Sequence, residues 1–313
     1  MEPSSQDTPL EPGASFDSVV GVRTIIPDDA FTAPLLGTHR EGSGVLIRRD
    51  GLILTIGYLI LEAESVWVVS AAGAAARAHI VGYDHDTGFG LIQAFDGLPD
   101  TVAALGDSDG CNVGDDVVLV GCEGVASATE ARIISKREFA GAWEYVLDEA
   151  LVTAPAHPDW SGAAVFDRGG RLLGIGSLYI QEVLEAPSRV DGNLSVPINL
   201  LKPIIDDIHG YGRIGVPARP WLGIYLAEAG DQVVVAGLAE RGPAAHAGLR
   251  AGDVVIDLGG VRAENVGQTF RQLWSLGAAG IDVPMTIGRG EERRHYVVKS
   301  ADRADSLKKL LLH

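Results

Sequence analysis

The chain has 313 residues, which is long enough for two or three packed domains. Its 42 Asp and Glu residues outnumber its 25 Lys and Arg residues, and a net charge of -17 repels phosphate backbones, so we expect no nucleic-acid partner. The chain is 46% hydrophobic, yet no run reaches the ~18 apolar residues of a membrane span.

The first segment, residues 1–17, is polar, contains three prolines and shows no periodic apolar pattern. Such a composition predicts a flexible tail. The segment also lacks the basic start and apolar centre of a secretory signal. From this absence we expect a cytoplasmic protein.

From Ser18 onward, short apolar runs are separated by Gly, Asp and Pro, which is typical of short strands joined by turns. The first block predicts strands at 19–26, 42–47, 52–55, 66–70, 76–81 and 90–94. The second block predicts strands at 116–121, 131–135, 144–148, 163–166, 172–177 and 194–196. Two successive blocks of about six strands predict two packed antiparallel barrels, over residues 18–104 and 110–198.

A helix over residues 199–209 is predicted next, with Asn199 as its N-cap, because leucines and isoleucines recur at helical spacing. It closes a domain spanning residues 18–209. Residues 210–219 contain several glycines and prolines and read as a linker.

The pattern changes after the linker and predicts a small α+β domain over residues 220–302. Strands are expected at 221–226, 232–236 and 253–258, a one-turn helix at 244–248, an amphipathic helix from 266 to a glycine stop at 277, and a hairpin at 285–289 and 295–299. In the tail, residues 303–313, two lysines beside four leucines predict a docked terminal helix over 306–313, with membrane contact as the alternative.

Ser161 stands between a turn, His157–Asp159, and a short apolar run, so its hydroxyl could be presented at the mouth of a barrel. A hydroxyl attacks a carbonyl only when a neighbouring base takes its proton and a third group orients that base. His157 and His85, with Asp84 and Asp86, could supply such groups in a relocated triad, but we expect both histidines to be solvated loop residues.

Several short motifs occur in a fixed order. They lie at residues 42–45, 51–55, 105–109 with 113–115, 197–200 and 242–254. In this order and spacing the chain resembles the HtrA family from about residue 18 to residue 303. The resemblance implies a mostly β protein, a trypsin-like double six-stranded β-barrel followed by a PDZ domain.

The resemblance also identifies the positions of a catalytic triad. Tyr58 stands where the family has its catalytic histidine, Gly88 where it has the orienting aspartate, and Ser161 at the nucleophile. Asp159 replaces the glycine that donates a backbone N–H to the oxyanion. A phenol with a pKa near ~10 is protonated at neutral pH and cannot accept the serine proton. The combined losses predict a rate lower by on the order of 10⁶-fold.

For the PDZ domain, the resemblance implies that Trp221, Leu222, Gly223 and Ile224 form a carboxylate-binding loop. The helix carrying Thr269, Phe270 and Leu273 would form the other wall of a peptide groove. The alternative is that Leu222 and Ile224 are ordinary strand core. The expected partners are protein C-termini or extended peptide segments.

Two functional hypotheses follow. The preferred one is a catalytically inactive HtrA-like protein that acts as a peptide-binding scaffold or complex subunit, and the alternative is a serine endopeptidase that uses Ser161 with a non-standard base. We expect no cofactor and no metal, because the histidines show no ligand spacing with cysteines or carboxylates. By analogy with the family, a homotrimer is expected, or else membership of a hetero-complex.

Overall fold

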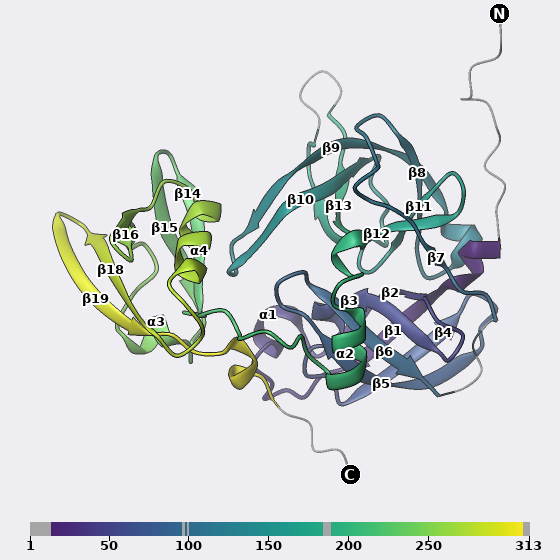
Figure 1. Ribbon diagram of the computed structural model, residues 1–313, viewed down its shortest axis with the longest axis horizontal. Helices are drawn as coiled ribbons and strands as arrows, with labels where there is room; N and C mark the ends of the chain where they lie inside the picture. Colours follow the sequence, from purple (N-terminus) through teal and green to yellow (C-terminus); the bar gives the residue numbers. More distant parts are fainter. Residues whose placement is uncertain (1–13, 96–97, 99, 184–188, 309–313) are drawn as a thin grey trace, which may run out of the picture. The chain divides into compact units, whose positions relative to one another are not determined.

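The computed structural model describes residues 14–95, 98, 100–183 and 189–308 (Figure 1). The chain forms two compact units. Of the described residues, the first contains those up to Arg137 together with Glu149–Ile214, and the second contains Glu138–Asp148 together with residues 215–308. The segment Glu138–Asp148 had been expected within the second barrel, but it packs with the second unit.

The first half of the first unit is a closed six-stranded barrel with the strand order β1-β2-β3-β6-β5-β4. Its strands are β1 (Val19–Ile25), β2 (His39–Leu46), β3 (Leu52–Ile56), β4 (Ser65–Ser70), β5 (Ala75–Tyr83) and β6 (Phe89–Ala94). All five residues of β3 are buried, as expected for a strand in the middle of a closed sheet. A short helix, α1 (Ala33–Leu36), lies in the connection between β1 and β2.

The second half is a seven-stranded sheet with the order β11-β8-β9-β10-β13-β12-β7, in which β11 also pairs with β12. This pairing closes a ring of six strands, and β7 joins β12 in parallel. The strands are β7 (Ala104–Leu105), β8 (Asp116–Val120), β9 (Thr129–Gly141), β10 (Tyr145–Ala154), β11 (Ala164–Asp167), β12 (Arg171–Ile180) and β13 (Gly192–Pro197). The predicted mostly β, double-barrel class is confirmed.

Two predicted segments of this unit differ from the structure. Residues 14–18 form a short 3₁₀ helix instead of tail, because Phe16 is buried against the ring of Phe166 at 5.3 Å; residues 1–13 lie outside the described residues. The predicted helix over 199–209 is a 3₁₀ turn at Ile198–Leu200 followed by α2 (Ile205–Tyr211). Asn199 does not cap it; its amide donates to Asp107 at 2.7 Å, and Pro203 disfavours helical backbone at the residue before it.

The second unit has one antiparallel sheet with the order β14-β15-β16-β18-β19, and β17 pairs with β16. Its elements are β14 (Ile224–Ala229), β15 (Gln232–Leu238), α3 (Pro243–His246), β16 (Val254–Leu258), β17 (Val261–Arg262), α4 (Val266–Ser275), β18 (Asp282–Arg289) and β19 (Glu292–Lys299). The α4 helix packs on β14 and β16 (Figure 1). Asn265 caps α4 by accepting a hydrogen bond from the Gln268 N–H at 2.8 Å.

Two further differences concern the ends of this unit. The strand predicted over 221–226 begins at Ile224, and Trp221 keeps only an isolated bridge to Ala301. Of the helix predicted over 306–313, residues 309–313 lie outside the described residues, and a 3₁₀ helix spans Arg303–Ser306 instead.

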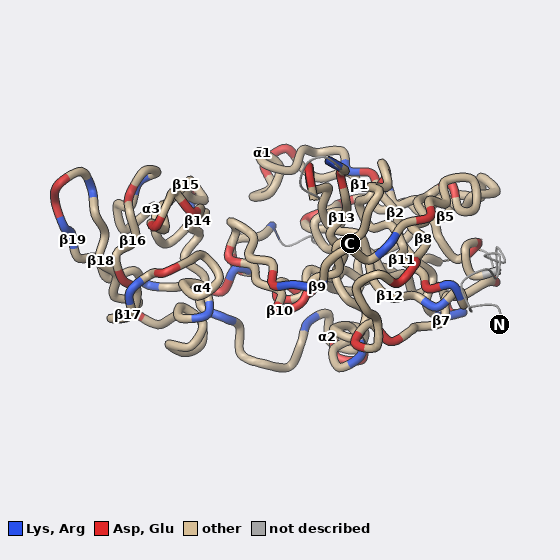
Figure 2. The backbone as a smooth tube through the Cα atoms, turned by 90° about the horizontal axis from the view of Figure 1, so that it is seen from above, with Lys and Arg blue, Asp and Glu red and all other residues tan. Residues whose placement is uncertain are grey.

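Acidic positions are spread over both units, with basic positions scattered among them (Figure 2). None of the helices in the described part of the chain is long and apolar enough to cross a membrane.

Candidate functional site

Ser161 lies in the turn that leads into β11, and its backbone is packed against β2. The Ser161 carbonyl accepts a hydrogen bond from the Ser43 N–H at 2.8 Å. Gly162 follows with φ +75, and a Cβ there would lie 2.0 Å from the Ser43 carbonyl oxygen, so only glycine fits. This turn therefore holds the Ser161 hydroxyl in a defined place.

Tyr58 faces that hydroxyl from the 3₁₀ turn Gly57–Leu59 after β3. Its hydroxyl donates towards Ser161 Oγ at 2.9 Å and towards the Ser177 carbonyl oxygen at 3.0 Å, and these two acceptors share one phenolic proton. Burial raises the pKa of Tyr58 above its usual range, while the hydrogen bond with Ser161 acts in the opposite direction. Tyr58 is therefore a protonated donor at neutral pH.

Arg40, which sequence reasoning missed, holds the backbone of the Tyr58 turn. It is 5% exposed, and its Nη1 donates to the Tyr58 carbonyl at 2.7 Å and to the Leu61 carbonyl at 3.2 Å. Burial lowers its pKa to about 10, opposed by the negative charge of Glu62, so Arg40 remains a cation. No sequence signal marks this arginine, because it stands between His39 and Glu41, before the strand predicted over residues 42–47.

Gly88 places backbone, not a side chain, beside the Tyr58 turn. Its carbonyl accepts a hydrogen bond from the Gly57 N–H at 2.7 Å, and its φ of +82 lies in the region that favours glycine. The nearby carboxylate of Asp84 accepts from the Thr87 N–H at 2.8 Å and hydroxyl at 2.7 Å. This carboxylate is thus engaged within its own loop.

His157 is a buried structural residue, 1% exposed, and not the solvated loop residue that we expected. Its Nε2 lies 2.6 Å from the Ser127 carbonyl, which can only accept, so Nε2 carries the proton. Its Nδ1 then accepts from the Asp159 N–H at 3.0 Å. These two hydrogen bonds hold the imidazole in an orientation away from the serine. They also engage the Asp159 N–H, which the resemblance places where the family has an oxyanion donor. His85 instead packs edge-on against Tyr83 at 4.9 Å.

Trp160, the residue before Ser161, has its ring 6.4 Å from the Tyr58 ring. Tyr58, Trp160 and Ser161 are therefore brought together. Gly88 meets this cluster only through backbone. Among the described residues, no group of three His, Cys, Asp or Glu side chains could hold a metal ion.

The residues predicted for peptide binding lie in the second unit. The side chains of Leu222, Ile224, Phe270 and Leu273 are fully buried in one apolar cluster, and the Thr269 hydroxyl donates to the Asn265 carbonyl at 2.7 Å. Trp221 is also buried. The side chains of Leu222 and Ile224 are thus core, as the alternative interpretation expected, while their backbone N–H groups remain available for hydrogen bonds outside the apolar cluster.

Those N–H groups, with that of Gly223, donate to the carboxylate of Glu144, which sequence reasoning missed. Glu144 Oε1 accepts from Gly223 at 2.7 Å, from Ile224 at 3.0 Å and from Leu222 at 3.1 Å. Burial raises the pKa of Glu144 to about 7, and the backbone donors and the positive charge of Arg303 act in the opposite direction. No sequence signal marks this glutamate.

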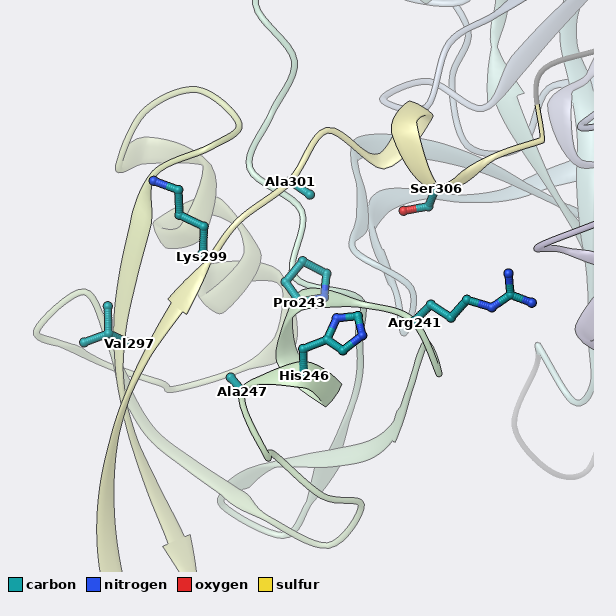
Figure 3. A pocket seen from close by; sticks show the side chains of 8 residues that line it. All are labelled: Arg241, Pro243, His246, Ala247, Val297, Lys299, Ala301 and Ser306. Carbon is teal, nitrogen blue, oxygen red and sulfur yellow. The ribbon is translucent and has the colours of Figure 1, made fainter.

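A separate hollow of about 460 Å³ lies beside α3 and β19 (Figure 3). Arg241, His246 and Lys299 contribute its basic groups. None of the residues predicted for peptide binding lines it.

Comparison with known proteins adds two family matches: a trypsin-like peptidase domain model matches residues 42–175, and a PDZ domain model matches residues 220–299. A probable periplasmic serine endoprotease DegP-like of Halomonas elongata is 26% identical over 281 residues, covering 85% of this chain and 57% of that protein. The serine protease Do-like HtrA of Lactobacillus helveticus is 26% identical over 285 residues, covering 81% of this chain and 67% of that protein. The chain spans about half to two thirds of the length of such relatives.

Among solved structures, the HtrA-type protease AlgW with decapeptide has a TM-score of 0.54 at 21% identity, covering 92% of this chain and 96% of that one. A serine endoprotease from Yersinia pestis also has a TM-score of 0.54 at 21% identity, covering 95% and 99%. These likenesses show the fold. The predicted cytoplasmic location is wrong, because relatives that match over most of the chain are named periplasmic. The two matched domains, their order and these relatives together support an HtrA-family protein, with a trypsin-like peptidase domain followed by a PDZ domain.

Proposed function

We propose that this HtrA-family protein has an impaired protease cleft and binds protein C-termini or extended peptide segments through its PDZ domain, as a scaffold or complex subunit. The observation that carries the proposal is the Tyr58 hydroxyl, which donates towards Ser161 Oγ from 2.9 Å. A general base must accept the serine proton, and a protonated phenol presents a proton instead.

Two further observations support this proposal. Gly88, at the position of the orienting acid, offers only backbone to the Tyr58 turn. The Asp159 N–H, at the position of an oxyanion donor, already donates to His157 at 3.0 Å. Losing the base, the orienting group and one oxyanion donor together costs on the order of 10⁶-fold in rate.

A second candidate is an active serine endopeptidase that uses Ser161 with a non-standard base. It is favoured by the retained serine, held in a defined turn, and by relatives named as serine endoproteases. This candidate requires Tyr58 to give up its proton at working pH, against the direction in which burial moves its pKa.

A fluorophosphonate probe separates the two candidates, because it reacts only with an activated serine. We expect no labelling of the full chain over the neutral pH range. Stoichiometric labelling that disappears in a Ser161→Ala variant would establish the endopeptidase and refute the impaired cleft. An active trypsin-like protease treated in parallel controls for the reactivity of the probe.

The PDZ part of the proposal rests on the converging N–H groups of Leu222, Gly223 and Ile224, which suit a carboxylate. Fluorescence anisotropy with peptides that end in a free carboxylate, compared with the same peptides amidated, tests it. The names of the relatives make the periplasm the compartment in which we propose that it acts. The homotrimer expected by resemblance remains a prediction, which light scattering of the full chain checks.

A further inference from the structure

The predicted carboxylate-binding loop is filled by a side chain of the same chain. The Glu144 carboxylate accepts hydrogen bonds from three successive backbone N–H groups, and its second oxygen also lies 3.1 Å from the Leu222 nitrogen. Glu144 is 7% exposed and has a φ of +58, in the left-handed region that non-glycine residues rarely adopt. A backbone loop binds the C-terminus of a peptide in the same way, through N–H groups that converge on one carboxylate.

The backbone beside Glu144 also follows the pattern of a bound peptide. One edge of β14 pairs with β15, and on the other side the Leu226 N–H donates to the Ala142 carbonyl at 2.9 Å. A peptide ligand of a PDZ domain adds to the sheet edge through the same kind of main-chain bond. The turn is held further by Arg303, which donates to the Trp143 carbonyl at 3.4 Å.

The segment also resembles a bound peptide in the apolar contact that one of its side chains makes. Val146, two residues after Glu144, is buried in the apolar cluster that contains Leu222, Ile224 and Phe270. A terminal carboxylate next to an apolar side chain in this cluster would make the same pair of contacts. Burying a valine side chain contributes on the order of 2 kcal/mol, so the contact helps to hold the segment in place.

The helix α4, which forms the other wall of the groove, contacts both ends of the segment. Arg271 of α4 pairs with Glu138 at 2.8 Å and with Asp148 at 2.6 Å. Gly267, one turn earlier on α4, lies so close that a Cβ there would be 2.3 Å from Glu138 Oε1. The segment from Glu138 to Asp148 therefore contacts the loop, β14 and α4, which are the three surfaces of the predicted groove.

We propose that the hairpin segment Glu138–Asp148 is an internal ligand of the PDZ groove, with Glu144 in the place of a terminal carboxylate, and that free C-termini bind by displacing it. The matching ligand class is a peptide with a free α-carboxylate and a valine-sized apolar last side chain. This inference rests on the proposed peptide binding and adds its regulation.

Competition of this kind has a measurable signature. A ligand that binds only the open groove has its affinity reduced by the fraction of molecules in which the groove is open. A tethered segment acts at an effective concentration on the order of 1 mM, so even a weak internal ligand keeps most grooves closed. Removing the Glu144 carboxylate should open the groove without touching the loop itself.

The test uses the full chain and a fluorescein-labelled decapeptide that ends in valine, either as free acid or as amide. We expect Glu144→Ala to bind the free acid about tenfold more tightly than the wild type, or better. The amide should bind neither. Glu130→Gln is the matched control, because Glu130 is an exposed carboxylate on β9, the strand that leads into the segment, and it should behave like the wild type.

Amide hydrogen exchange of the unliganded chain gives an independent readout. We expect slow exchange at Leu222, Gly223 and Ile224 in the wild type and at least tenfold faster exchange in Glu144→Ala. Equal exchange in the wild type and in Glu144→Ala, or equal affinity of the two for the free acid, would refute the proposal of an internal ligand. The proposal that the groove binds peptides would then be unaffected. If no variant binds the free acid while exchange still depends on Glu144, the internal contact is real and peptide binding by this groove is refuted.

Discussion

Raising the pH from 6 to 8 should loosen the contact between Glu144 and the carboxylate-binding loop. Burial raises the pKa of Glu144 from 4.5 to about 7 when the hairpin is docked. An undocked hairpin exposes the same carboxyl to water, where its pKa returns to the ordinary value. The docked state thus binds the proton more tightly than the undocked state.

The sign of the effect follows from this difference. A carboxyl whose pKa is raised favours the docked state at low pH, and this contribution is lost as the pH rises through the docked pKa of about 7. With pKa values of 4.5 and about 7, the docking equilibrium weakens by about tenfold between pH 6 and pH 8, or about 1.4 kcal/mol. Arg271 and Arg303, the cations in contact with the segment, stay protonated throughout.

The assay is the affinity of the free-acid decapeptide for the full chain, measured by anisotropy at pH 6, 7 and 8. The α-carboxylate of the peptide is ionised at each of these pH values, so tighter binding at pH 8 reports release of the hairpin. Glu144→Gln should abolish the pH dependence and thereby separate this carboxyl from the histidines of the chain. An affinity that is flat across the range, or that falls as the pH rises, would refute the reasoning.

Three substitutions test the packing inside each of the two units. His157→Ala should lower the free energy of unfolding by roughly 2–4 kcal/mol in urea titration, because backbone groups of Ser127 and Asp159 lose a buried partner; a negligible loss would contradict the observed ring position. Arg40→Ala should cost on the order of 3 kcal/mol, and Arg40→Lys less, in the same assay, and equal costs would speak against the fork of hydrogen bonds. Phe270→Ala, in the core of the second unit, should cost about 3–5 kcal/mol in thermal unfolding, whereas an unchanged transition would mean that the helix is not packed as described.

The strands were predictable because their signals are local. Apolar runs of four to eight residues, interrupted by Gly, Pro and Asp, indicate a strand wherever they occur, and most of the predicted strands overlap observed ones. The assignment of Tyr58 and Gly88 to triad positions rests on the resemblance alone and stays a prediction. The failures, at Phe16 and in the helix expected from Asn199, arose where a tertiary contact overrode the local pattern.

The sequence by itself therefore indicated the resemblance to the HtrA family and the order of the two domains, whereas its assignment of residues to the triad positions stays a prediction. Only the tertiary structure decided which way His157 points and what fills the carboxylate-binding loop. Glu144 lies 78 residues from Leu222 along the chain, and a glutamate in a hairpin turn looks like any solvated acid until folding surrounds it. Hydrogen bonds between such distant groups depend on where the whole chain places them, and no local pattern encodes that.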